Sequence, residues 1–147
     1  MSLRAFSSGV NVVAYSKDGH KFAMSCAWAT MIDYSYVALL LGEQSETGNN
    51  LHVDDLVGIS SLSSNQKDLA FKFGSSHSSE EDKFKGVQYL SKNQALFIKD
   101  AKVKLHCRVH KILHLLDDSK DNFIIFEVLS YEDDKNKKFL HYEDIAD

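Results

Sequence analysis

The chain has 147 residues, of which 44% are hydrophobic and 26% are charged, and its formal net charge is −4. This composition is typical of a globular protein and excludes a disordered one, and a chain of this length folds without a metal or a disulfide. The net negative charge argues against nucleic acid as a partner, because phosphate backbones would be repelled overall.

The sequence predicts one continuous, cytoplasmic domain over residues 1–147. It contains no proline, no internal repeat and no low-complexity linker. Its start lacks a secretion signal, and no apolar run approaches the roughly 20 residues that span a bilayer. The two cysteines, Cys26 and Cys107, lie within apolar runs, which favours reduced thiols over a disulfide.

The first two predicted strands form a hairpin. Val10–Tyr15 is rich in β-branched residues, and Asp18-Gly19 favours a tight turn after it. The next segment, Lys21–Thr30, has a bulky face and a small face, since Phe22, Met24, Cys26 and Trp28 alternate with Ala23, Ser25, Ala27 and Ala29. The small face leaves room for a flat ring; alternatively, its residues pack under a neighbouring helix.

Two buried strands with a short helix between them are expected next. Tyr36–Gly42 and Val57–Leu62 are short apolar runs of the kind that form buried strands. Between them, Ser45–Leu51 predicts a short helix with Thr47 as the capping residue. Hydroxyls beside the free N–H groups of a helix start favour an anion such as a terminal phosphate, and the alternative is an ordinary N-cap.

The second half of the chain predicts a longer helix and a closing hairpin. Ser63–Gln66 has the spacing of a capping box, so Ser64–Phe73 is expected to be a helix, followed by a polar surface loop over Ser75–Glu81. Lys102–Leu116 suits either a strand or a helix by its periodicity. Its neighbour Asn122–Tyr131, rich in phenylalanine and isoleucine, favours a strand pair.

These elements add up to an all-β fold of six or seven antiparallel strands with one or two short helices, in the form of a small barrel. The fold also bears on a possible metal site. Residues four apart on a strand are separated by about 13 Å, which is too far for one ion to bind His106, His110 and His114. No metal site is therefore expected.

The order of these segments resembles the flavin-reductase-like, FMN-binding split-barrel family over nearly the whole chain. The similar pieces are the strand Lys21–Thr30, the turn Ser45–Gly48, the helical segment Asp68–Gly74, the segment Asp82–Val87 with its Lys-Phe-x-Gly pattern, and the strand pair Leu105–Val109 and Ile124–Val128. Five pieces in the right order are fairly specific. The resemblance implies a split barrel of Greek-key type that holds FMN at the interface of a homodimer.

The resemblance also implies which residues contact the cofactor. The isoalloxazine ring would be lined, mostly through backbone groups, by Ser25, Cys26, Ala27, Trp28, Ala29 and Thr30. The phosphate would be held by Ser45, Thr47 and Asn50, with Lys83 as a further charge partner. The implied chemistry is hydride transfer from NADH or NADPH to flavin N5, followed by electron donation to an acceptor, with no side chain identified as catalytic.

Two departures from the family pattern keep alternatives open. Asp33-Tyr34-Ser35-Tyr36 stands where the family often has an Asp-Pro-Pro-like turn, and Asp121-Asn122 stands where its reductases often carry a histidine associated with the nicotinamide. The second departure bears on the use of NAD(P)H more than on the binding of FMN. Three functions follow: a flavin reductase, an FMN electron carrier reduced by a partner, and a flavin-free binding barrel.

Overall fold

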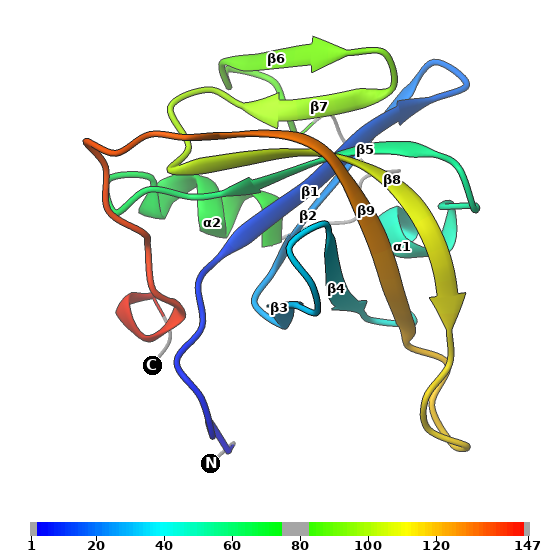
Figure 1. Ribbon diagram of the computed structural model, residues 1–147. Coiled ribbons are helices and arrows are strands. Elements are labelled where there is room, and N and C mark those ends of the chain that lie inside the picture. The colour runs from blue at the N-terminus through cyan, green and yellow to red at the C-terminus, as the bar shows by residue number, and fades with distance from the viewer. Residues whose placement is uncertain (1–2, 75–82, 146–147) are drawn as a thin grey trace.

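The computed structural model describes residues 3–74 and 83–145, which form one antiparallel sheet of nine strands that curls into a barrel without closing (Figure 1). The strand order is β3-β4-β9-β8-β5-β1-β7-β6, with β2 paired to β1. The strands are β1 (Asn11–Lys17), β2 (His20–Cys26), β3 (Ala29–Met31), β4 (Tyr36–Leu41), β5 (Leu56–Ser61), β6 (Tyr89–Lys92), β7 (Ala95–Ile98), β8 (Val103–Leu113) and β9 (Asn122–Asp133). The predicted all-β, split-barrel fold class is confirmed.

Strand β1 is the branching point of the sheet. One edge pairs with β2 along its whole length, from Asn11 opposite Cys26 to Lys17 opposite His20. The other edge pairs first with β5 and then, at Tyr15, with β7. The turn between β1 and β2 is the predicted Asp18-Gly19, whose φ angles of 52° and 81° are those that a tight hairpin turn requires.

Residues 21–30 do not form the single strand that their alternation predicts. Strand β2 ends at Cys26, and after two residues the chain continues as β3, which pairs with β4 instead of β1. The pairing with β1 runs out because Asn11 is the first residue of β1. As a result Cys26 is buried, whereas Trp28, predicted to lie on the same face, is exposed.

Three strands beyond the predicted segments raise the count from the expected six or seven to nine. Strand β3 arises from the break in residues 21–30. Strands β6 and β7 form a short hairpin over residues 89–98, seen at the top of Figure 1. The four residues of β6 are all exposed and those of β7 are all buried, so neither strand alternates in the way that marks a half-buried strand in a sequence.

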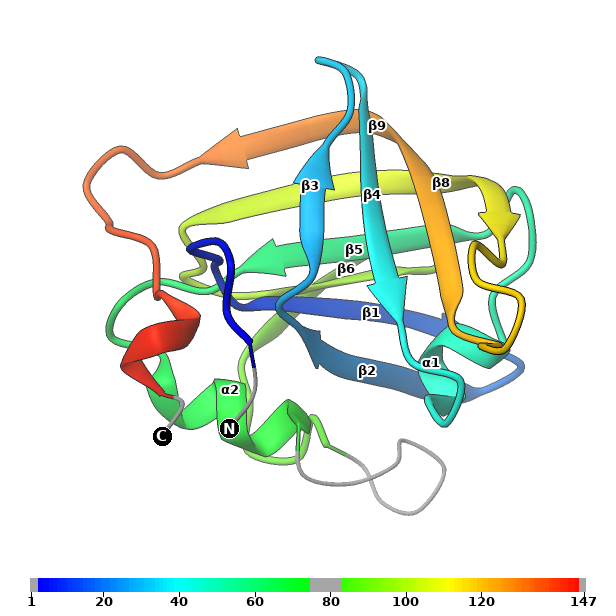
Figure 2. The same ribbon diagram turned by 90° about the horizontal axis from the view of Figure 1, so that it is seen from below.

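The sheet separates two hydrophobic cores, and β1 contributes to both. Val13 and Tyr15 face the core inside the barrel, while Val12 and Ala14 face a second core that includes helix α2 (Lys67–Gly74). Figure 2 shows α2 beneath β1 and β2. Because both faces of β1 are covered, its sequence is apolar on both faces.

The helices follow local capping rules, with two corrections. Helix α1 (Glu46–Asn49) is capped by the side chain of Ser45 rather than by Thr47. The predicted helix Ser64–Phe73 is α2, which begins at Lys67 rather than at Ser64. Before it, the Gln66 side chain accepts a hydrogen bond from the Ser63 backbone, which is one of the two hydrogen bonds of a capping box. A 3-10 turn, η1 (Tyr142–Asp144), follows β9, and the predicted loop Ser75–Glu81 lies outside the described residues. In the part of the chain that the structure describes, no helix has the length and apolarity to cross a membrane.

We expect Gly58→Ala to destabilise the protein strongly. A Cβ at Gly58 would collide with the Leu96 carbonyl and lie 2.7 Å from its carbon, because β7 passes close to β5 at this position. Overpacking against a backbone costs about 3 kcal/mol or more in such a case. Urea unfolding followed by circular dichroism measures the loss, and the control Gly42→Ala, which meets nothing closer than 3.9 Å, should change stability by about 0.5 kcal/mol or less. Equal stability of the two variants would contradict this packing.

Candidate functional site

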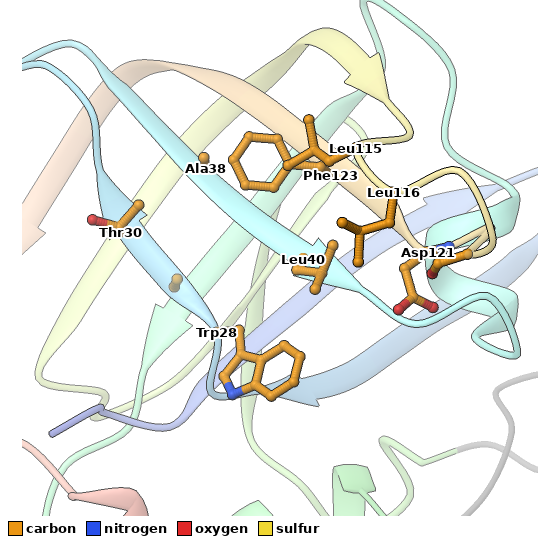
Figure 3. A pocket seen from close by; sticks show the side chains of 10 residues that line it. Trp28, Thr30, Ala38, Leu40, Leu115, Leu116, Asp121 and Phe123 are labelled. Carbon is orange, nitrogen blue, oxygen red and sulfur yellow. Dashed lines mark hydrogen bonds between the residues drawn. The ribbon is translucent and has the colours of Figure 1, made fainter. Parts of the chain in front are cut away.

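An apolar cavity of about 420 Å³ lies between the β2–β3 connection, β4 and the hairpin of β8 and β9 (Figure 3). Its size falls within the range of small-molecule sites. It is lined by Trp28, Ala29, Thr30, Ala38, Leu40, Leu115, Leu116, Ser119, Asp121 and Phe123. We call it the Trp28 cavity.

Large apolar side chains form two walls of the Trp28 cavity. Figure 3 shows the Trp28 indole on one side of β4 and the side chains of Leu115, Leu116 and Phe123 on the other. Trp28 is 69% exposed and Leu116 is 66% exposed, which is unusual for residues of this size. Between these walls, the small side chains of Ala29 and Ala38 leave space over the backbone of β3 and β4. The shape and the chemistry suit a planar aromatic ring.

The charge around the Trp28 cavity is negative. Asp121 is the charged residue among its lining residues, and its carboxylate accepts a hydrogen bond of 2.7 Å from the Glu43 backbone. An adjoining cleft is lined by the acids Glu43, Asp117 and Asp118 together with the cation of Lys120. This end of the molecule therefore favours neutral over anionic groups.

A second cavity, of about 330 Å³, lies on the other side of β3. It shares Ala29 and Thr30 with the Trp28 cavity and adds Ala27, with Asn11 and His141 among its polar lining residues. Strand β3 is only three residues long and all three are exposed. This short strand, with small side chains at Ala29 and Thr30, thus separates the two cavities.

The structure divides the small face that the sequence predicts for residues 23–29. Ala27 and Ala29 reach the cavities, but Ala23 packs in the core with α2, and the Ser25 hydroxyl donates a 2.8 Å hydrogen bond to the carbonyl of Ala70 in that helix. The alternative interpretation, packing under a helix, is confirmed for Ala23 and Ser25. Cys26 lies in the barrel core, where burial raises the pKa of its thiol to about 12.

The predicted phosphate residues of α1 lie beside β2, outside the Trp28 cavity. The Ser45 hydroxyl accepts from the Gly48 backbone at 3.0 Å and contacts Met24 Sδ at 2.8 Å. Thr47 is only 2% exposed, and the Asn50 side chain donates to the carbonyl of Glu46. The hydroxyl of Ser45 and the amide of Asn50 therefore hold the local structure together, as in an ordinary N-cap.

Lys83 is buried and bonded to the backbone. It is 5% exposed, and its ammonium group donates to the carbonyls of Ala23 and Phe73, both at 3.1 Å. It therefore ties β2 to the end of α2. The structure does not bring this cation to the Trp28 cavity.

Sequence reasoning missed most of the walls of the Trp28 cavity. The pattern of Lys102–Leu116 predicts a strand or a helix, but β8 ends at Leu113 and leaves Leu115 and Leu116 exposed in the turn. Two adjacent leucines before an acidic turn are the sequence signal for this wall. Phe123 and Leu40 come together because β9 pairs with β4, with Leu40 opposite Phe123. Asp121, noted for its departure from a family pattern, lines the same cavity.

Comparison with known families gives a match over nearly the whole chain. The sequence profile described as the flavin reductase like domain matches residues 3–145. No curated protein sequence matches the chain significantly.

Several solved structures share the fold at low sequence identity. An NADH:FAD oxidoreductase, SgcE6, from Streptomyces globisporus has a TM-score of 0.82 and 19% identity, over 92% of this chain and 81% of that one. Flavoredoxin from Methanosarcina acetivorans has a TM-score of 0.79 and 14% identity, over 91% and 73%. An FMN-binding protein from Thermus thermophilus has a TM-score of 0.77 and 16% identity, over 92% and 82%. At these identities the likeness establishes the fold.

Lys83→Met tests whether this lysine is structural. The change removes two hydrogen bonds from a buried cation to carbonyls, each worth about 1.5–3 kcal/mol, so we expect a loss of about 3 kcal/mol in the free energy of unfolding. Urea denaturation measures it. Lys85→Met, at an exposed position two residues later, is the matched control and should behave as the wild type. A Lys83→Met protein as stable as its control would contradict a structural role for this lysine.

Proposed function

This chain belongs to the flavin reductase like domain family, and we propose that it is an NAD(P)H-dependent flavin reductase that binds FMN. Flavin binding is supported by the family. The observation that carries the proposal is the Trp28 cavity, which combines an exposed indole, apolar walls and a strand of small residues. Aromatic rings stack on such a surface and gain from its desolvation.

In this proposal the isoalloxazine ring lies against residues 28–30. The indole of Trp28 stacks on the ring. Because the side chains of Ala29 and Thr30 are small, the ring can approach the β3 backbone closely. Leu115, Leu116 and Phe123 exclude water from the opposite side. The same role extends, by resemblance, to Ala27 and to the backbone groups of Ser25 and Cys26.

The phosphate group is proposed to lie at the start of α1. The contact between Ser45 and Met24 brings this helix start beside β2, and β2 ends at Cys26, two residues before Trp28 of the cavity. Ser45 and Asn50, both half-buried, are the accessible members of the predicted set, while Thr47 and Lys83 are buried.

The chemistry that FMN supplies when bound is hydride acceptance at N5 and transfer of the electrons onward. The chain's residues bind and orient the ring and keep water away from it. The Cys26 thiol stays protonated at neutral pH, since burial raises its pKa to about 12, and it takes no part as a nucleophile. None of the lining residues needs to act as an acid or base.

A homodimer is part of the proposal. The β3–β4 side of the molecule exposes a set of large apolar side chains next to the Trp28 cavity, namely Trp28, Met31, Ile32, Leu115 and Leu116. Exposed apolar side chains in one region mark interaction surfaces. A second copy covering this side would close the cavity over a bound ring.

We also propose that residues 1–147 work as a single cytoplasmic domain.

An FMN electron carrier, reduced by a partner protein, is the second candidate. It is favoured by Asp121, which places a carboxylate where the family's reductases often carry a histidine associated with the nicotinamide. Asp121 and the acids of the adjoining cleft both repel the negatively charged nicotinamide dinucleotides.

Anaerobic mixing with nicotinamides tests the reductase proposal. The flavin-loaded protein should lose its visible absorption when NADH or NADPH is added in excess, because hydride transfer reduces the ring. Stopped-flow absorbance follows the reaction, with dithionite as the control for reducible flavin. Bleaching by dithionite but by neither nicotinamide would favour the electron carrier. Protein that stays colourless and does not bind added FMN would exclude both.

The phosphate contact is tested by comparing FMN with riboflavin, which lacks the phosphate. Ser45→Ala combined with Thr47→Ala should weaken FMN by about tenfold or more and riboflavin much less, since charge-assisted hydrogen bonds contribute about 1.5–3 kcal/mol each. Calorimetric titration of both ligands gives the two losses. Thr30→Ala is the matched control, and it should weaken both ligands equally because it lies at the ring. Equal losses in the Ser45 and Thr47 variant would place the phosphate elsewhere.

A further inference from the structure

A third cavity, of about 360 Å³, lies between the β6–β7 hairpin and the strands β8 and β9. It is lined by Leu90, Lys92, Phe97, Lys104, His106, Ser130, Tyr131 and Glu132. On β9, Ser130 follows Phe123 of the Trp28 cavity by seven positions, which is about 23 Å along the strand. The two cavities are therefore separate sites on the molecule, and we call this one the His106 cavity.

Two lysines of the His106 cavity carry unpaired positive charges. Lys92 is the last residue of β6, and Lys104 is near the start of β8. Among residues 3–74 and 83–145, neither ammonium group has a hydrogen bond or an ion pair, in contrast to Lys102, which is paired with Asp133. Glu132 stands opposite Lys104 in the sheet but is outside ion-pair distance.

His106 forms part of the wall of this cavity and is unusual in its burial. His106 is only 7% exposed, and its Nε2 atom is buried without a hydrogen-bond partner in the described structure. The imidazole meets the ring of Phe97 edge-on at a centroid distance of 6.0 Å. Burial, and then the charge of Lys92, lower the pKa of His106 below its usual value.

The geometry points to a binding site for a small organic anion, which places its carboxylate or phosphate group between Lys92 and Lys104 and its apolar, ring-sized body against Phe97 and Leu90. Two unpaired cations at one opening supply the charge, and the apolar residues supply the contact area. The hydroxyl of Ser130, which lines the same cavity opposite His106 in the sheet, is available as a further donor.

The size of the cavity suits a small aromatic anion. A volume of about 360 Å³ is near the lower end of small-molecule sites, which run from about 300 to 1,000 Å³. The inference does not rest on the proposed flavin function, because none of these residues lines the Trp28 cavity. It predicts a second ligand that binds whether or not flavin is present.

Titration of the full chain with four probes tests this site. We expect phenyl phosphate and benzoate to shift the ¹H–¹⁵N NMR signals of residues around the His106 cavity in a saturable way, and neutral benzamide to leave them unchanged at the same concentrations. Inorganic phosphate, which has no apolar body, should bind at least tenfold more weakly than phenyl phosphate. Benzamide binding as well as benzoate would overturn the role of the lysines, and equal binding of the two phosphates would overturn that of the apolar wall.

The variant Lys92→Gln with Lys104→Gln should bind phenyl phosphate at least tenfold more weakly, and unchanged affinity would overturn the proposal. Lys67→Gln with Lys111→Gln is the matched control, because it removes the same net charge from exposed positions outside the cavity. Flavin affinity of both variants should equal that of the wild type, so failure of this site and failure of the flavin proposal are distinguishable. If the first variant does not fold, the benzoate and benzamide pair on the unmodified chain decides.

Discussion

The pairing of both edges of β1 determines where the other parts of the molecule lie. Its backbone bonds β2 on one side and β5 followed by β7 on the other, and its two faces are covered by different cores. With every edge and face in use, β2 must end where β1 begins, at the pair of Asn11 and Cys26. The chain then crosses to β4, and this crossing is what leaves Trp28 exposed at the edge of a cavity.

The hydrogen bonds at the start of α1 bear on the proposed phosphate contact. The Ser45 hydroxyl caps the Gly48 backbone, an interaction worth about 1 kcal/mol. A phosphate bound as proposed would accept hydrogen bonds from the same groups, at about 1.5–3 kcal/mol for each charge-assisted bond. On these magnitudes the cap does not oppose the proposed contact. Thr47 differs, since its burial requires a movement of the backbone before it can contact a ligand.

Local chemistry made some elements predictable from the sequence, and long-range pairing hid others. Asp18-Gly19 and Ser63–Gln66 act through neighbours in the chain; the predicted turn is confirmed, and the predicted helix forms with a start at Lys67 instead of Ser64. The alternation of residues 21–30 correctly indicates extended backbone, but it carries no information on which strand is the partner, so the break after Cys26 was missed. The Trp28 cavity was found only in part for the same reason: its far wall comes from the β8–β9 hairpin, which reaches Trp28 through the pairing of β9 with β4.

Electrostatics, rather than a catalytic side chain, separates a reductase from an electron carrier in this molecule. Hydride transfer to a flavin needs the donor ring in van der Waals contact with the flavin and needs no proton from the protein. The donor is a dianion or more, and Asp121 with the acids of the adjoining cleft opposes its approach. The opposition acts at the rim, where salt screens it over about 8–10 Å at physiological ionic strength. These charges therefore slow an anionic donor without excluding it. The same charges would steer a basic partner protein that delivers electrons toward this rim.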